Sequence, residues 1–327
     1  MNKSPVLSVQ NLRVAFQSNT TLNEVLHGIS YDVFPNEILG IVGESGSGKS
    51  VASLAVMGLL PPKNSVISSG AVIFNNEDLL NYSQKQLEEL RGQKIAMIFQ
   101  EPMSALNPSM NCGKQVEEIL LQHTNISKKA AKEEVIRLFN AVKIPEPESS
   151  SKKYPHEISG GQQQRVMIAM ALLCGPEVLF ADEPTTALDV TIQAQILELM
   201  KNLQKSIGTA VVLVTHDLGV VAGITDRVAV MYAGRIVEEG TTAEVFANPQ
   251  HPYTRGLLES MPRIDTPIQK TLYAIPGLPP DLGNLPAGCP FHPRCASATN
   301  QCQNIYPETR VISSTHQATC WEVEGSK

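Results

Sequence analysis

The chain has 327 residues, of which 42% are hydrophobic and 18% are charged, and its formal net charge is −6. This length suffices for about two domains with a sizeable core. The acidic balance argues against a nucleic-acid partner, because no basic field draws polyanions to the surface. No run of about 18 apolar residues is present, and the first residues lead into a strand pattern, so we expect neither a membrane span nor a signal peptide.

Alternating apolar and polar residues predict an antiparallel sheet at the start of the chain. The alternation covers residues 7–16 and returns at Ile29, Tyr31 and Val33. Phe16 stands where an aromatic ring could stack on an adenine base. An ordinary strand aromatic is the alternative interpretation, and the sequence leaves both open.

Residues 43–50 match the phosphate-binding P-loop pattern, in which two glycines separated by four residues precede lysine and serine. A buried strand over residues 38–42 is expected before them, and a helix over residues 51–60 after them. Glycines let successive N–H groups face phosphate oxygens, and the helix N-terminus adds partial positive charge. Lys49 would reach the β- and γ-phosphates, and the Ser50 hydroxyl would ligate Mg²⁺. The predicted nucleotide-binding residues of this loop are Gly43, Glu44, Ser45, Gly46, Ser47, Gly48, Lys49 and Ser50.

A helical insert and a second glycine-rich turn follow. Residues 112–142 have helical periodicity, which prolines at 145 and 147 then break. Ser159, Gly160, Gly161 and Gln162 come next, and Ser159 is a good helix N-cap. Bare backbone N–H groups at a helix start make a second phosphate-binding surface. Because the first loop already covers one ATP, the second indicates a site completed between subunits.

Polar groups also follow three predicted strands. Gln100 closes an apolar run, which alone is a weak signal, and Asp182 and Glu183 close another. Adjacent carboxylates repel, so burying both requires a cation or a chemical role. Asp182 fits a Mg²⁺-side carboxylate, and Glu183 fits the group that polarises the attacking water. His216 follows a β-branched strand, at the carboxyl end where α/β proteins bind ligands. A hairpin over residues 228–237 is expected to close the domain.

These motifs, in this order, resemble the ATP-binding subunit of an ABC transporter over roughly residues 5–245. The resemblance implies an α/β P-loop NTPase fold: a RecA-like core, an antiparallel β subdomain and a helical subdomain at about 101–165, within an ATP-binding domain spanning 1–245. The implied roles are Gly43–Ser50 as Walker A, Gln100 as Q-loop, Ser159–Gln162 as signature, Asp182 as Walker B, Glu183 as catalytic glutamate, Asp189 in the D-loop and His216 as switch histidine. Ser50, Gln100 and Asp182 would surround Mg²⁺. Ile158 stands where Leu is usual and Phe16 where Tyr is common, and neither departure puts hydrolysis in doubt.

After about residue 246 the chain becomes rich in proline and glycine, and we expect a separate extension over 246–327 that is too loop-rich to build a large core unaided. Residues 251–258 (His-Pro-Tyr-Thr-Arg-Gly-Leu-Leu) and the Cys-Pro…Pro-Arg-Cys segment resemble the extension of oligopeptide and dipeptide importer ATPases, of the type that pairs with a second ATPase. Nickel importers share much of this pattern.

Four cysteines of the extension, Cys289, Cys295, Cys302 and Cys320, are candidate metal ligands. Disulfides are not expected inside a cell. The intervals of five, six and seventeen residues match neither a paired zinc ribbon nor a bacterial ferredoxin, which leaves zinc slightly ahead as the commoner structural ion. The resemblance instead implies a [4Fe–4S] cluster. His292 and His316 are possible substitutes, but with four cysteines available they are expected to be bystanders.

The resemblance also implies how the chain works. Two such domains would face each other head to tail, each ATP lying between one Walker A and the other signature. The expected function is ATP-driven import of di- or oligopeptides, on the cytoplasmic face of the inner membrane as a peripheral subunit. The expected partners are a second ATPase, two integral membrane permease subunits and, indirectly, an extracytoplasmic solute-binding protein.

Three alternatives remain beside peptide import. The same machine could carry nickel or heme. A soluble ABC ATPase acting on ribosomes or DNA is less favoured, because ribosome factors generally carry two cassettes and the DNA-repair kind a long coiled coil. A nucleotide-binding regulator without turnover is disfavoured by the intact Glu183.

Overall fold

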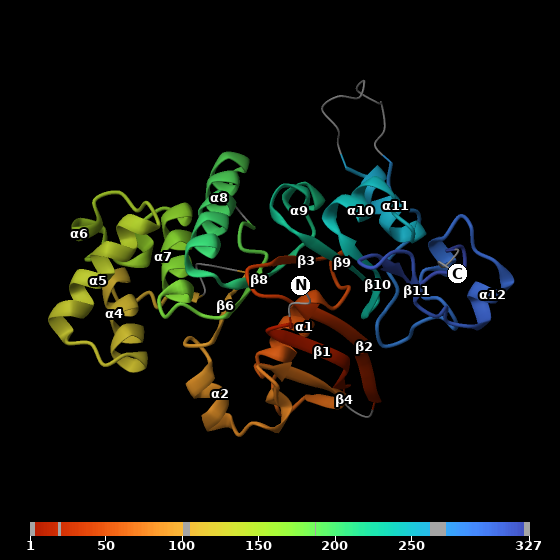
Figure 1. Ribbon diagram of the computed structural model, residues 1–327, viewed down its shortest axis with the longest axis horizontal. Coiled ribbons are helices and arrows are strands. Elements are labelled where there is room, and N and C mark those ends of the chain that lie inside the picture. Colours follow the sequence, from red (N-terminus) through yellow and green to blue (C-terminus); the bar gives the residue numbers. More distant parts are fainter. Residues whose placement is uncertain (1–3, 19–20, 101–104, 187, 262–272, 324–327) are drawn as a thin grey trace. The chain divides into compact units, whose positions relative to one another are not determined.

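A computed structural model describes residues 4–18, 21–100, 105–186, 188–261 and 273–323 of the chain (Figure 1). The chain divides into two compact units. The first contains Phe34–Asn36 and Tyr82–Leu213 with the start of the chain, and the second contains Leu7–Val33, Glu37–Asn81 and Val214–Lys327. None of the described helices is long and apolar enough to cross a membrane.

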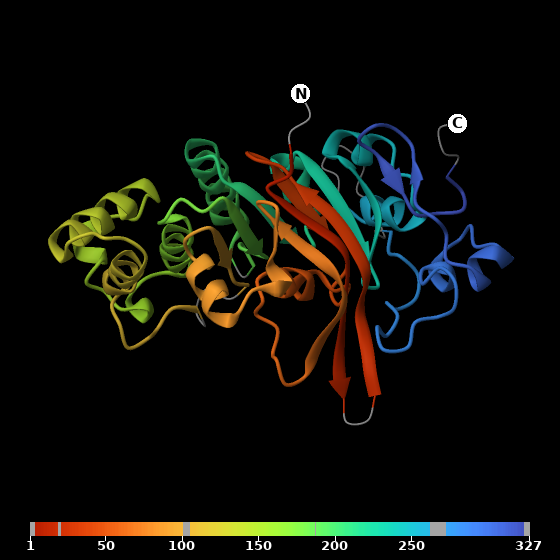
Figure 2. The same ribbon diagram turned by 60° about the horizontal axis from the view of Figure 1, so that its bottom comes forward.

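The second unit contains the predicted antiparallel sheet, with strands in the order β2-β1-β4-β5. Figure 2 shows its long strands side by side. Their bounds are β1 Leu7–Ser18, β2 Thr21–Val33, β4 Ser65–Phe74 and β5 Glu77–Asp78. Val9 and Leu12 are both buried although they are three residues apart. A β-bulge between them, with Asn11 at a φ of 45°, resets the alternation and keeps the apolar side chains on one face.

A second sheet of this unit runs in the order β3-β9-β10-β12-β11. Its strands are β3 Ile38–Val42, β9 Arg227–Tyr232, β10 Arg235–Thr241, β12 Gln317–Ala318 and β11 Arg310–Val311. β3 is parallel to β9, and β9 and β10 form the predicted hairpin. Its two turn residues, Ala233 and Gly234, both have positive φ, as a tight hairpin turn requires. β12 pairs with β10, so the C-terminal extension adds strands to this sheet.

The remaining elements of the second unit are short. They are α1 Lys49–Val56, η1 Leu79–Asn81, α9 Leu218–Ile224, α10 Thr242–Ala247, α11 Pro252–Glu259, η3 His292–Arg294 and α12 Asn300–Asn304 (Figure 1). Tyr253 and Phe291 of the extension are buried in one cluster with Val42, Val230 and Tyr232. The predicted boundary near residue 245 therefore does not separate two cores, because a loop-rich segment is stable only when it shares apolar burial with neighbouring elements.

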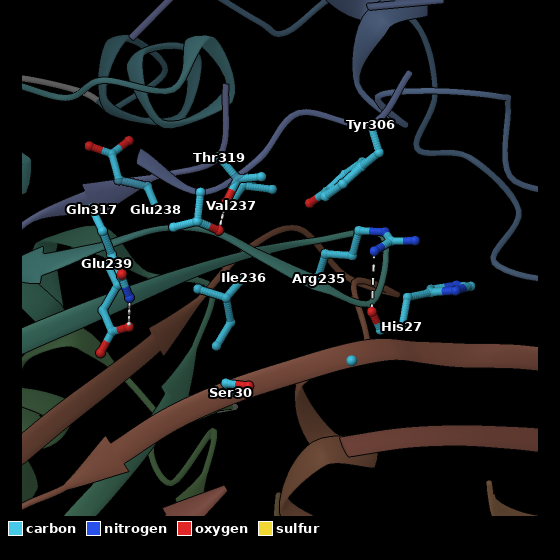
Figure 3. A pocket seen from close by; sticks show the side chains of 12 residues that line it. His27, Ser30, Arg235, Ile236, Val237, Glu238, Glu239, Tyr306, Gln317 and Thr319 are labelled. Carbon is cyan, nitrogen blue, oxygen red and sulfur yellow. Dashed lines mark hydrogen bonds between the residues drawn. The ribbon is translucent and has the colours of Figure 1, made fainter. Parts of the chain in front are cut away.

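A second set of contacts joins the extension to β10. There, β2, β10 and the extension line a cavity of about 280 Å³ (Figure 3). The Arg235 guanidinium lies 4.2 Å from the centre of the Tyr306 ring and donates to the His27 carbonyl at 3.2 Å. The Thr319 amide donates to the Val237 carbonyl at 2.8 Å. These contacts hold the extension on β10 close to two of its cysteines, since Tyr306 follows Cys302 by four positions and Thr319 directly precedes Cys320.

In the first unit, strands follow the order β8-β7-β6. They are β6 Ile95–Ile98, β7 Val178–Asp182 and β8 Ala210–Thr215, whose last two residues belong to the second unit. The helical elements are α2 Gln84–Leu90, α4 Cys112–His123, α5 Lys128–Ala141, α6 Pro147–Ser150, η2 Pro155–Glu157, α7 Gly160–Leu172 and α8 Val190–Ile207 (Figure 1). The periodicity at 112–142 thus forms two helices, α4 and α5, and residues 101–104 at the start of the predicted subdomain lie outside the described residues.

Candidate active site

The P-loop joins β3 to α1, but the helix differs in its bounds from the predicted 51–60. It begins at Lys49, with Gly48 as N-cap at a φ of 102°, and ends at Val56. Gly58 has a φ of 61°, which reverses the chain before the prolines at 61 and 62 are reached. Gly43 is required by space, because a Cβ atom there would lie 2.1 Å from the Met231 carbonyl oxygen. The end of β9 therefore limits the path of the loop.

Lys49 lies inside the loop, with 5% of the residue exposed. Its Nζ donates to the carbonyls of Gly43 at 2.8 Å and Glu44 at 3.0 Å, and to the Ser47 hydroxyl at 3.4 Å. Anionic phosphate is a stronger acceptor than these neutral oxygens, so a nucleotide can take their place on the ammonium.

We expect Lys49→Ala to weaken ATP binding at least about tenfold, because a hydrogen bond to a charged group contributes about 1.5–3 kcal/mol. Calorimetric titration with ATP measures this. Lys63→Ala, at an exposed position of the same unit, is the matched control and should bind like the parent. Unchanged affinity and turnover in Lys49→Ala would remove the lysine from the site.

Glu44, inside the P-loop, is held by two residues of the C-terminal extension. Its backbone nitrogen donates to the Tyr253 hydroxyl at 2.7 Å. Its carboxylate accepts from both terminal nitrogens of Arg294, at 2.6 and 2.9 Å. Sequence reasoning missed both partners, although the His-Pro-Tyr and Pro-Arg-Cys motifs contain them, because no spacing rule connects residues more than 200 positions apart.

Tyr253 owes its place to a chain of buried hydrogen bonds from β10. The fully buried Glu238 carboxylate accepts from the His251 amide at 2.8 Å. His251 Nδ1 in turn accepts from the Tyr253 amide at 3.0 Å and caps α11. Burial lowers the pKa of His251 to about 3, so the ring is neutral at physiological pH and Nδ1 has a lone pair to accept with. The His-Pro-Tyr motif thus forms the start of α11 and places the Tyr253 hydroxyl where the Glu44 amide of the P-loop donates to it.

Two other predicted site residues belong to the same unit. Phe16 is half-buried on β1, paired in register with Asn23 and Ser65, which agrees with both of its interpretations. His216 is exposed directly after β8. The next residue, Asp217, caps α9 by accepting from the Gly219 amide at 2.8 Å.

The first unit brings Gln100 and Glu183 together from the ends of β6 and β7. Gln100 Nε2 donates to Glu183 Oε2 at 3.1 Å, and the Thr186 hydroxyl donates to the same oxygen at 2.9 Å. Asp182 is the last residue of β7 and is buried, whereas Glu183 has a φ of 44°. A left-handed glutamate is uncommon and is typical of functional sites. Asp182 is buried and Glu183 is half-buried, so the two neighbouring carboxylates lie in different surroundings.

The signature segment and the D-loop meet in this unit. Ser159 caps α7 as predicted, in a reciprocal capping box whose Gln162 side chain accepts from the Ser159 amide at 3.0 Å. A Cβ atom on Gly161 would lie 3.0 Å from Ile192, and Asp189 caps α8 by accepting from the Ile192 amide at 2.9 Å. Ser159, Gly160 and Asp189 are exposed. Gln162 therefore shapes the helix start, while the exposed residues face outward from their unit.

The four cysteines of the extension line one cavity, although they are distant in sequence. Burial first, and the thiols of Cys320, Cys302 and Cys295 in addition, raise the pKa of Cys289 to about 11. The cavity has a volume of about 20 Å³, room for about one water molecule. Within the described ranges, no group of three or more His, Cys, Asp or Glu side chains is arranged to hold a metal ion. His316 is engaged with Glu238 at 2.8 Å, whereas His292 borders the cavity, as His251 does.

Two family models match the chain. An ABC transporter model matches residues 26–186, and a model of the oligopeptide/dipeptide transporter C-terminal region matches residues 237–302. The first includes the P-loop, Gln100, the signature and Glu183. The second includes Tyr253, Arg294 and three of the four cysteines.

Full-length relatives agree with these matches. The chain is 51% identical to the dipeptide transport ATP-binding protein DppD of Bacillus subtilis over 97% of this chain and 94% of that protein. It is 50% identical to the oligopeptide transport ATP-binding protein OppD of Salmonella typhimurium over 92% and 89%.

Solved structures show the same fold. The dimeric ATP-binding cassette MJ0796, in a post-hydrolysis state with ADP and Pi, has a TM-score of 0.65 at 27% identity, over 72% of this chain and 98% of that one. CbiO1 of Clostridium perfringens has a TM-score of 0.64 at 30% identity, over 75% and 92%. The chain therefore belongs to the ABC transporter ATP-binding proteins, in the family that carries the oligopeptide/dipeptide C-terminal region.

Proposed function

We propose that this chain hydrolyses ATP to power import of dipeptides or oligopeptides through membrane-embedded partners. The observation that carries the proposal is the pairing of two features in one chain. First, the side chains proposed to act on ATP have fixed partners: Lys49 donates to the Gly43 carbonyl inside the P-loop, and Glu183 accepts from Gln100. Second, the extension matches the oligopeptide/dipeptide type along most of its length.

The proposed chemistry divides between the motifs. Glu183 accepts the proton of the attacking water, and Gln100 and Thr186 orient its carboxylate through Oε2. Lys49 and the loop N–H groups neutralise phosphate charge that develops on the leaving side. Ser50, Gln100 and Asp182 would hold Mg²⁺, which supplies further charge neutralisation when bound. His216 would contact the γ-phosphate, and Phe16 the adenine.

We also propose that two cassettes complete each other's sites. Ser159 and Gly160 are exposed at a capped helix start, where unsatisfied N–H groups favour an anion from outside the unit. The second cassette is proposed to be a related ATPase rather than a copy of this chain. Two permease subunits, a solute-binding protein on the far side, and a peripheral position on the cytoplasmic face of the inner membrane complete the proposed assembly.

A transport experiment tests this function. A strain lacking this chain should lose uptake of di- or oligopeptides and regain it with the parent gene, but not with Glu183→Gln. Affinity purification of the tagged chain should retain permease subunits and a second ATPase. If the deletion strain took up peptides normally but lost uptake of nickel or heme, the transported solute would be nickel or heme and not a peptide. Recovery of ribosomes or DNA instead of permeases would contradict transport, and two copies of this chain as the only ATPases would contradict the heteromeric pair.

Finally, we propose that the four cysteines hold a [4Fe–4S] cluster. The support is a complete set of four free thiols on one cavity within a small extension. The cavity is small, so its lining would have to move outward when a cluster assembles. Its role here would be to stabilise the extension, not to act on ATP.

A further inference from the structure

We propose that Arg294 and Tyr253 are positioning residues for ATP binding: from the C-terminal extension, they clamp Glu44 and thereby set the conformation of the P-loop. All three residues belong to the second unit. The inference deepens the function proposed above, since it rests on the chain's being an ATPase.

The clamp holds Glu44 at two different points. Arg294 binds the carboxylate with both terminal nitrogens, a paired geometry that fixes orientation as well as distance. Tyr253 takes the backbone N–H, which directs this amide to the extension. One side-chain contact would leave the loop free to rotate about it. Two contacts, one of them on the backbone, fix the peptide itself.

The clamp is itself rigidly mounted. The Arg294 side chain is only 4% exposed, and its Nε donates to the Pro276 carbonyl at 2.9 Å. Its guanidinium lies 5.9 Å from the centres of both the Tyr232 and Phe291 rings. The Tyr253 ring packs on the same two rings, at 4.5 and 5.4 Å. Little further ordering is therefore needed when the loop binds its ligand.

This geometry matters for nucleotide because P-loop binding depends on several N–H groups that point inward together. Glu44 lies between Gly43, whose path is set by Met231, and Ser45 and Gly46, which are exposed. The other hydrogen bonds given for this stretch come from within the loop: the Ser47 amide donates to the Glu44 carbonyl at 3.2 Å, and Lys49 donates to the carbonyls of Gly43 and Glu44. A more mobile loop loses conformational entropy each time ATP binds, which weakens the binding.

The clamp also has a place in the extension that links it to the cysteines. Arg294 is the last residue of η3 and directly precedes Cys295, and Cys289 lies five positions before it. The His292 amide donates to the Cys289 carbonyl at 3.0 Å, so the turn between the two cysteines is short and closed. Whatever holds these two cysteines therefore also holds the arginine.

Two variants test the clamp in the full-length chain. Tyr253→Phe keeps the aromatic packing and removes only the hydroxyl acceptor, and Arg294→Met keeps the apolar stem and removes the paired donors. Each should raise the Kd for ATP about tenfold, at a temperature where the variant is folded. Arg294→Lys, which retains charge without the paired geometry, should lie between parent and Arg294→Met. Arg255→Met is the matched control and should leave the Kd unchanged, because Arg255 binds the carbonyls of Pro249 and Gln250 and lies 3.7 Å from the Glu322 carboxylate, away from Glu44.

Hydrogen exchange separates a local effect on the P-loop from a general loss of stability, because it reports the opening of each segment separately. Tyr253→Phe should speed exchange in the peptide containing residues 43–48, while peptides from β9 and β10 exchange like the parent. Parent-like ATP affinity and parent-like exchange in both clamp variants would overturn the proposal. If the parent itself fails to bind ATP, the proposed function is wrong. If the parent binds ATP and both variants bind it equally well, only the clamp proposal is wrong.

Discussion

Glu183→Gln should lower ATP turnover by at least about 10², while ATP binding remains close to that of the parent. The amide cannot accept a proton from water, but it keeps the size of the carboxylate and an oxygen that can accept from Gln100 and Thr186. Glutamine can adopt the positive φ at this position as readily as glutamate, because the two side chains have the same shape near the backbone. With hydrolysis blocked and binding kept, the chain should accumulate in its ATP-bound form with its partner cassette.

Single-turnover phosphate release measures the hydrolysis rate, and titration with nucleotide measures the affinity for ATP. Glu198→Gln, on the exposed side of α8 in the same unit, is the matched control and should turn over like the parent. Turnover in Glu183→Gln within a few-fold of the parent would exclude this residue as the base. Loss of ATP binding together with turnover would point instead to a disturbed fold.

The second large effect is expected at the cysteines. Protein purified without oxygen should contain about four irons and four acid-labile sulfides per chain, with visible charge-transfer absorption. Cys302→Ser should lose all of this iron and unfold at a lower temperature, because a cluster that binds only the folded extension stabilises it. Iron content is read directly and does not depend on activity.

Cys174→Ser is the matched control for this experiment, since Cys174 is a free, partly buried thiol of the other unit. It should keep the parent's iron content and thermal stability. Stoichiometric zinc without iron in the parent would contradict the cluster. A metal-free parent, or a Cys302→Ser protein with an equally stable extension, would contradict any structural metal there.

The sequence alone determined the motifs and the local structure around them. The P-loop, the strands that precede Gln100 and Glu183, and the Ser159 cap are local patterns, and β3, β6, β7 and the start of α7 lie where the residues predict them. Local patterns suffice here because a strand period, a glycine at positive φ or a capping box is set by neighbours a few positions away. The end of α1 differs from the prediction, because Gly58, with a φ of 61°, follows the helix end at Val56 and precedes the prolines at 61 and 62.

Only the tertiary structure decided what the C-terminal extension does to the rest of the molecule. The residues suggested a separate appendage, yet Tyr253 and Phe291 are buried with β3 and β9, and β12 pairs with β10. The sequence also predicted Glu44 as a nucleotide-binding residue without any hint that Arg294 holds it. The physical reason is that hydrogen bonds and ion pairs between residues 209 and 250 positions apart depend on where the sheet places both ends of the chain, and no local propensity or spacing carries that information.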